Sequence, residues 1–75
     1  MEKNKNMRVG DIYYNPMACD LWILRKDIYE DDEEESWVLS LVHSEYIEKY
    51  EYVKGFVHVG NIYDLVSENM NKRSR

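Results

Sequence analysis

Hydrophobic and polar residues alternate along two stretches of the chain, residues 20–29 and residues 36–43. In the first stretch, Trp22, Leu24 and Ile28 fall on one side of an extended backbone. In the second stretch, Trp37, Leu39 and Leu41 do so. Because successive side chains of a strand point to opposite faces, a period of two predicts a β-strand in each stretch. The short connection between them predicts an antiparallel hairpin with residues 30–35 at its tip.

The rest of the chain predicts shorter elements. Residues 12–14 form a β-prone stretch that ends at Asn15-Pro16, residues 52–59 return to strand character, and residues 62–66 form a last short strand. Between them, Ser44 is suited to cap a helix and Glu45 lies four residues before Lys49, which predicts a short helix at 44–50. Residues 1–7 and 68–75 lack an apolar period and are expected to be flexible tails. We therefore expect one domain over 8–67, all-β or β-rich α+β.

The sequence GFVHVGNIYDLV at 55–66 resembles the end of an SH3-like barrel, where a glycine-led strand is followed by a tight turn and a short closing strand. The resemblance extends at fold level over roughly residues 8–67. It implies a small five-stranded antiparallel barrel with 12–14, 21–29 and 37–42 as its first three strands. The first loop is shorter than in peptide-binding SH3 domains and their Ala-Leu-Tyr-Asp-Tyr motif is absent, so the resemblance does not imply binding of proline-rich peptides.

The connection at the hairpin tip, called here the acidic segment, is an unbroken run of carboxylates. Its members are Glu30, Asp31, Asp32, Glu33, Glu34 and Glu35. An unpaired buried carboxylate is strongly unfavourable, so the segment is expected to face solvent or a partner. It lacks the alternating ligands and the glycine of a calcium loop. It is either a solvated loop that keeps an aromatic domain soluble or a docking element.

The net charge supports a basic partner. The chain has 15 acidic and 10 basic residues, a net charge of −5. Most of the bases lie near the two ends, so residues 9–71 contain four bases against 14 acids. Acids outside the acidic segment add to the field, among them Asp11, Asp20, Asp27, Glu45, Glu48, Glu51 and Asp64. Such a body is expected to repel nucleic acid and to attract a basic protein surface.

Seven tyrosines are more than a small core can bury. Tyr14 and Tyr29 are expected to lie exposed near the acidic segment, where a tyrosine adds contact area to an interface at little entropic cost. Together with the six acids, these two residues form the predicted partner-binding site.

No catalytic, metal-binding or cofactor-binding motif is present in the sequence. His43, His58 and Cys19 lie far apart in the chain and do not show ligand or nucleophile spacing. A single cysteine rules out an internal disulfide and favours a reducing setting, the cytoplasm, and no segment reads as a signal peptide or a membrane span. We expect no enzyme activity and no cofactor.

These patterns favour a non-enzymatic interaction module that inhibits a basic, nucleic-acid-binding protein by occupying its surface. Small size and high acidity are similar in composition to phage anti-defence proteins, including anti-CRISPR inhibitors. One alternative is a small-ligand binder that stacks a nucleotide-like molecule on aromatic residues. Another is a structural subunit of a virion or a larger complex, and a homo-oligomer remains open because it would enlarge a thin core.

Overall fold

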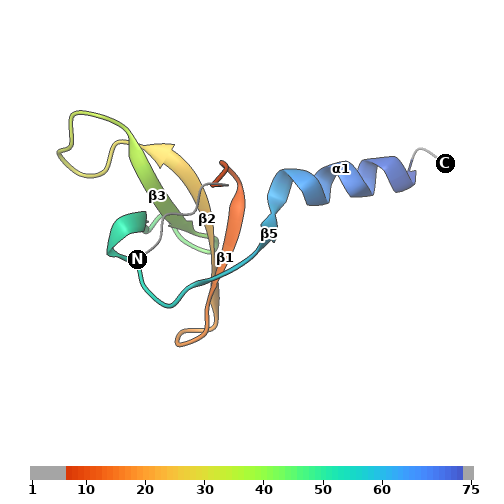
Figure 1. The fold of residues 1–75 in the computed structure, drawn as a ribbon, viewed down its shortest axis with the longest axis horizontal. Coiled ribbons are helices and arrows are strands. Elements are labelled where there is room, and N and C mark those ends of the chain that lie inside the picture. Colours follow the sequence, from red (N-terminus) through yellow and green to blue (C-terminus); the bar gives the residue numbers. More distant parts are fainter. Residues whose placement is uncertain (1–6, 74–75) are drawn as a thin grey trace.

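The chain folds into one antiparallel sheet followed by a helix (Figure 1). The computed structural model describes residues 7–73, with side chains up to residue 70. The elements in chain order are β1 (Asp11–Asn15), β2 (Asp20–Asp27), β3 (Ser36–Leu41), β4 (Ile47–Lys49), the 3₁₀ turn η1 (Tyr50–Tyr52), β5 (Val57–Asn61) and α1 (Ile62–Arg73). The five strands and one helix confirm the β-rich α+β class. Of the predicted tails, residues 68–73 belong to α1, and residues 1–6 and 74–75 lie outside the described residues.

The predicted hairpin is confirmed, with the acidic segment at its tip. β2 and β3 pair antiparallel from Trp22 opposite Leu41 to Asp27 opposite Ser36, so only residues 28–35 remain to connect them. The alternation of side chains sets this register, because a slip by one residue would move Leu24 and Leu39 from the core face to the other face.

The sheet is open, and this corrects the predicted closed barrel. Its strand order is β4-β3-β2-β1-β5, so β4 and β5 form its two edges and do not pair with each other. β5 also contains an irregularity where it meets β1, between Ile12 and Tyr13. A bulge of this kind strengthens the local twist of a strand pair.

Two of the shorter predicted elements have a different structure. Residues 44–50, predicted as a helix, contain β4, because residues 47–49 pair with Val38, Leu39 and Ser40 on the edge of β3. The only helical turn nearby is η1. Residues 62–66, predicted as a strand, instead begin α1, since the Oδ1 of Asn61 accepts the backbone N–H of Tyr63 at 2.8 Å and caps the helix.

One face of the sheet holds the hydrophobic core. The buried cluster consists of Tyr13, Trp22, Leu24 and Leu39. Half-buried residues from the N-terminus, from β3 and from the segment between β4 and β5 cover it, namely Met7, Trp37, Leu41, Tyr50, Val53 and Phe56. Three of the four residues in the buried cluster, Trp22, Leu24 and Leu39, come from the hairpin strands β2 and β3, and Tyr13 comes from β1.

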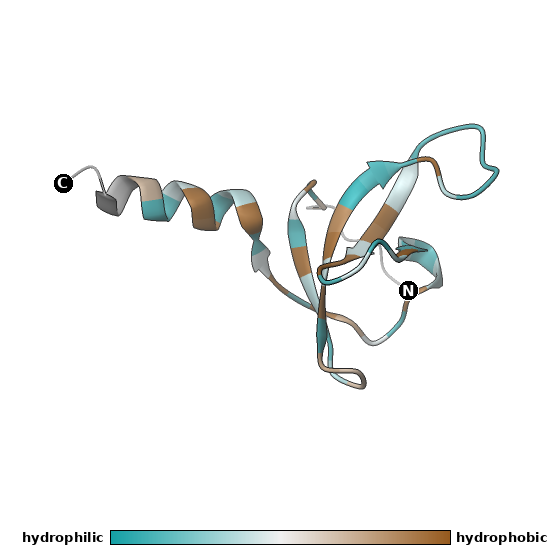
Figure 2. Ribbon diagram, turned by 180° about the vertical axis from the view of Figure 1, so that it is seen from behind, coloured by the Kyte–Doolittle hydropathy of each residue, from teal (hydrophilic) through white to brown (hydrophobic). Residues whose placement is uncertain are grey.

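The helix α1 projects away from the sheet rather than packing on it (Figures 1 and 2). The molecule is accordingly elongated, with extents of 47 × 29 × 28 Å. Bands of hydrophobic and hydrophilic residues alternate along α1, whereas the acidic segment is uniformly hydrophilic (Figure 2). Within the described residues, no helix has the length and apolar character needed to cross a membrane.

Candidate functional site

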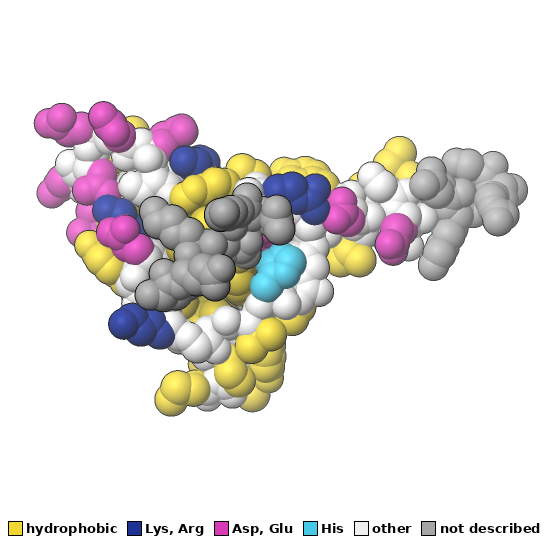
Figure 3. Space-filling model, viewed as in Figure 1, with side chains coloured by type: hydrophobic (Ala, Val, Ile, Leu, Met, Phe, Trp, Pro, Cys, Tyr) yellow, Lys and Arg dark blue, Asp and Glu magenta, His cyan; other side chains and the backbone are white. Residues whose placement is uncertain are grey.

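The acidic segment lies on an exposed loop at one end of the molecule, where acidic side chains gather in the space-filling view (Figure 3). The loop turns at residues 29–32, where the backbone N–H of Asp32 donates to the carbonyl of Tyr29 at 3.0 Å and Glu30 takes a left-handed conformation, with φ 54°. Five of the six acids are exposed: Glu30, Asp31, Glu33, Glu34 and Glu35. The solvent exposure predicted for this segment is confirmed.

Asp32 differs from its neighbours because it fastens the loop to the sheet. The Nζ of Lys49 in β4 lies 3.0 Å from the Oδ2 of Asp32, and the Lys49 side chain is only 18% exposed. The same ammonium lies 3.8 Å from Glu51 and above the ring of Tyr52. The hydrogen bond to Asp32 raises the pKa of Lys49 despite the opposing effect of burial, so this lysine stays charged.

Tyr29 forms the second attachment of the loop. Its ring meets Tyr52 edge to face, with centroids 6.3 Å apart, and its hydroxyl donates to Oε1 of Glu48 at 3.4 Å. Burial together with the nearby carboxylates of Glu30 and Glu48 raises the pKa of Tyr29 to about 12. Tyr29 is half-buried and adjoins the acidic segment, as its position in the sequence predicted, but its contacts are with β4 and η1.

Tyr14 does not belong to this site. It pairs with Leu21 at the start of β2, whereas the acidic segment follows the end of β2, so the length of that strand separates them. Tyr14 instead lies beside Cys19 in the β1–β2 turn, and a hydrogen bond with the Cys19 thiol raises the pKa of its hydroxyl. The predicted grouping of Tyr14 with the six acids is therefore not found in the structure.

Lys49 and Tyr52 belong to the site, but the sequence did not indicate them. Lys49 was interpreted as the helical partner of Glu45, whereas in the strand β4 it reaches Asp32 across the sheet. A useful signal would have been the Ile47-Glu48-Lys49 alternation. Three residues are nevertheless too few to distinguish a strand from a helical turn by period alone.

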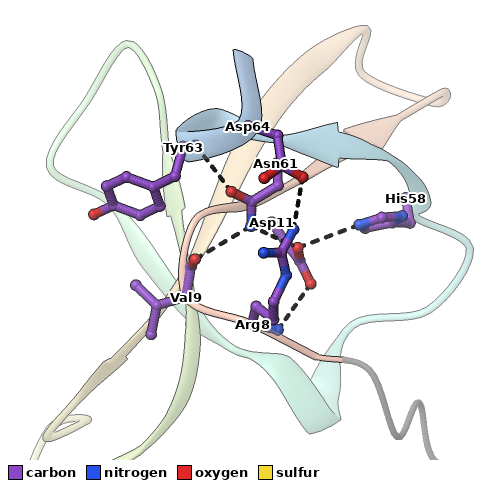
Figure 4. A network of polar contacts seen from close by, with 7 residues as sticks. All are labelled: Arg8, Val9, Asp11, His58, Asn61, Tyr63 and Asp64. Atoms are coloured by element: carbon purple, nitrogen blue, oxygen red, sulfur yellow. Dashed lines mark hydrogen bonds and ion pairs between the residues drawn. The ribbon is translucent and has the colours of Figure 1, made fainter. Parts of the chain in front are cut away.

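A second polar cluster joins β1, β5 and α1 (Figure 4). At its centre, the buried carboxylate of Asp11 accepts the Nδ2–H of Asn61 at 2.9 Å and the backbone N–H of Arg8 at 3.0 Å. The Nε2 of His58 lies 3.4 Å from the same carboxylate. Burial acts to raise the pKa of Asp11, but these hydrogen bonds and the nearby His58 outweigh it and leave the pKa below its ordinary value.

The same cluster fixes the start of α1. Asn61 donates to the carbonyl of Val9 while its Oδ1 accepts the N–H of Tyr63, and Arg8 lies 2.7 Å from Asp64. The ring of Tyr63 also covers Gly10 so closely that a Cβ there would lie 2.5 Å from it. The cluster, called here the β5–α1 junction, is a structural anchor.

Ion pairs reduce the negative charge outside the acidic segment only in part. Asp64 is paired with Arg8, and Asp27 lies 2.9 Å from Arg25. Asp11 is buried with neutral hydrogen-bond donors, and the exposed Glu45 and Glu68 add to the field outside the β2–β3 loop. The loop is nevertheless the place where five exposed carboxylates lie together.

Within the described residues, no group of three or more His, Cys, Asp or Glu side chains is arranged to hold a metal ion. Several of the aromatic rings contact one another. Trp22, for example, meets Tyr46 and Phe56 at centroid distances of 5.9 and 5.6 Å. No family model, curated protein sequence or solved structure matches this chain.

Proposed function

We propose that this chain is a non-enzymatic interaction module whose acidic segment docks on a basic, nucleic-acid-binding surface of a partner protein and blocks it. The observation that carries the proposal is that one loop exposes five carboxylates, while the contacts of Lys49 and Tyr29 hold the base of that loop to the sheet. Fixing the base limits the conformational entropy that the loop loses on binding.

The electrostatic mechanism follows from the spacing of the charges. Several carboxylates within a few residues attract a basic groove over about 10 Å at moderate salt, and this increases the association rate. The half-buried Tyr29 and the exposed Tyr52 and Ile28 beside the loop supply apolar contact for the bound state.

The finer identity is part of the same proposal. The order of the strands supports an SH3-like arrangement that has opened between β4 and β5. The small size and the acidity support a role like that of phage anti-defence or anti-CRISPR inhibitors acting in the host cytoplasm.

The test uses two variants with the same change in net charge. Glu33→Gln/Glu34→Gln/Glu35→Gln neutralises three exposed acids of the segment and leaves Asp32 bound to Lys49. Glu2→Gln/Glu45→Gln/Glu68→Gln neutralises three acids outside the segment, leaves Asp32 and Glu51, the ion-pair partners of Lys49, unchanged, and serves as the control. Each protein is used to capture partners from a lysate of the native host at about 0.05 M and about 0.5 M salt.

We expect the wild type and the control to retain a partner at low salt and to lose it at high salt, and the segment variant to retain roughly tenfold less. Duplex DNA added to the complex should displace the partner. Equal capture by the two triple variants would refute docking through the acidic segment, and a partner unaffected by DNA would refute the nucleic-acid-binding surface.

A further inference from the structure

The sheet face opposite the core, called here the outer face, carries exposed apolar side chains. Paired residues of an antiparallel sheet lie side by side on the same face. The register therefore places Val57, Tyr14 and Leu21 in one row across β5, β1 and β2, and a backbone bond from Val42 to Leu21 extends that row beyond β3. Val57, Leu21 and Val42 are 50%, 40% and 45% exposed.

The outer face changes character along the strands. The next row contains half-buried Ile12, Ile23 and Ile47. The row after that contains Arg25 and Lys49 on either side of the fully buried Val38, and it is followed by the acidic segment. The outer face is thus apolar near the β1–β2 turn and charged near the acidic segment. Along the molecule as a whole, hydrophobic side chains lie at the lower end and acids at the upper left in the view of Figure 3.

The helix α1 carries a second exposed apolar surface. Ile62, Leu65 and Val66 are spaced three and four residues apart, so they lie on one side of the helix. Leu65 and Val66 are 47% and 48% exposed. One chain thus has an apolar helix side and an apolar sheet face, and these are the two surfaces that commonly pack together as layers.

The chain's own helix does not cover its own outer face. The β5–α1 junction holds the first turn of α1 through Asn61, through the Arg8–Asp64 ion pair and through the ring of Tyr63 on Gly10. These contacts direct α1 away from the sheet (Figure 1). Folding back would require them to break, whereas a second copy can cover both surfaces with the junction intact.

We propose that a second copy of this chain is the occupant, with the α1 of each copy lying on the outer face of the other. The dimensions agree, because Ile62 to Met70 spans about 12 Å of helix and Leu21 to Arg25 spans about 13 Å of strand. Reciprocal exchange removes both surfaces from water in both copies and closes the assembly as a two-fold dimer.

Charge sets the direction of the helix. Asp64 and Glu68 lie in the first two turns of α1. With its C-terminal end toward the acidic segment of the other copy, α1 keeps these two acids away from that segment, whereas the reverse direction brings acids together. This arrangement does not use the carboxylates of the segment, so the dimer is independent of the proposed docking function.

The oligomeric state of the full chain tests the proposal by sedimentation equilibrium over a range of protein concentrations. We expect a dimer for the wild type and for Ser67→Asp, which adds a charge on the opposite side of α1. Leu65→Asp on the helix and Leu21→Asp on the outer face should each give a monomer that remains folded by circular dichroism, with Val42→Asp as a second outer-face variant. A monomeric wild type, or a dimer that survives Leu65→Asp, would overturn the proposal.

The single cysteine provides a test of geometry. Cys19 is exposed in the β1–β2 turn beside the apolar row. One sample of the protein carries a nitroxide spin label on Cys19 and no ¹⁵N. It is mixed with a second sample that carries ¹⁵N and no spin label, so that only broadening between two copies is observed. We expect amide broadening to be strongest in the first turn of α1 and weaker in its last turn. Broadening confined to the outer face, or none on mixing, would contradict this arrangement.

Discussion

The acidic segment and the β5–α1 junction both contain carboxylates, but the structure places them in opposite environments. Glu33, Glu34 and Glu35 face solvent on a loop, whereas Asp11 is 2% exposed and accepts hydrogen bonds from Asn61 and Arg8. A solvated carboxylate contributes little to folding but much to the long-range field, and a buried, bonded one does the reverse. Acids that the sequence alone adds to one net charge therefore have different roles: Asp11 stabilises the fold, and the loop acids produce the external field.

The largest expected effect is at the centre of the junction. Asp11→Ala removes the acceptor of the part-buried Arg8 N–H and one of the two acceptors of the Asn61 Nδ2 group, which is buried. It should lower the free energy of unfolding by about 3 kcal/mol. The measurement is urea denaturation of the wild type and the variant. Asp31→Ala makes the same change on the loop and should leave the urea midpoint nearly unchanged. Equal effects of the two substitutions would show that the buried Asp11 contributes no more to stability than a solvated carboxylate.

The next effect concerns the close approach of α1 to the sheet. Gly10→Ala should cost about 2 kcal/mol of unfolding free energy, because a Cβ would lie 2.5 Å from the Tyr63 ring and φ is +96°. Gly55→Ala is the matched control, since φ there is +83° but nothing lies within 4 Å of the added Cβ. It should cost about 1 kcal/mol from backbone strain alone.

Adding Tyr63→Ala to Gly10→Ala separates the two causes. It should recover the part of the loss that comes from the clash and leave the part that comes from φ. If Gly10→Ala and Gly55→Ala lower the unfolding free energy equally in urea denaturation, the packing of Tyr63 on Gly10 does not contribute to stability.

The pH dependence of stability should come from the junction. The folded pKa of Asp11 lies below its unfolded value, about 3.9, so its contribution is complete above about pH 5 and is lost as the pH falls through the folded value. The difference in urea midpoint between the wild type and Asp11→Asn should therefore shrink below about pH 4. A difference that stays constant from about pH 6 to about pH 3 would contradict this assignment.

The smallest effect is expected where the loop meets the sheet. Lys49→Gln should lower the urea midpoint slightly, and a double-mutant cycle with Asp32→Asn should show a favourable coupling that weakens at high salt. The same cycle with Glu33→Gln should show no coupling, because Glu33 is an exposed residue of the loop. If the coupling of Lys49 to Glu33 were as large as its coupling to Asp32, the summed negative charge of the loop, and not the ion pair with Asp32, would hold the loop to the sheet.

The strongest local patterns predicted the centre of the fold. Alternation in residues 20–29 and 36–43 was long enough to define β2, β3 and their register, and it placed the acidic segment at the hairpin tip. Burial of six adjacent carboxylates is unfavourable under any arrangement of the other strands, so the exposure of the segment was also predictable. For Tyr29, proximity to the segment followed from its adjacent position in the chain.

The edges of the fold depended on contacts that are distant in sequence. Residues 47–49 form a strand because the edge of β3 offers hydrogen-bonding groups, not because of their own short pattern. Ile62, Leu65 and Val66 have helical spacing, and Asn61 before them is a suitable N-cap, so these residues do indicate a helix. Residues 62–66 were predicted as a strand because residues 55–66 resemble the end of an SH3-like barrel.

The sequence by itself determined the hairpin, the core strands and the exposure of the acidic segment, because these follow from local periodicity and from the cost of burying charge. Only the tertiary structure decided that the sheet stays open, that Tyr14 lies at the far end from the acids, and that Asp11 is a buried anchor. Each of these depends on which strands become neighbours. That choice joins residues that are distant in sequence, such as Asp11 and Asn61, which are 50 positions apart, and no local pattern records it.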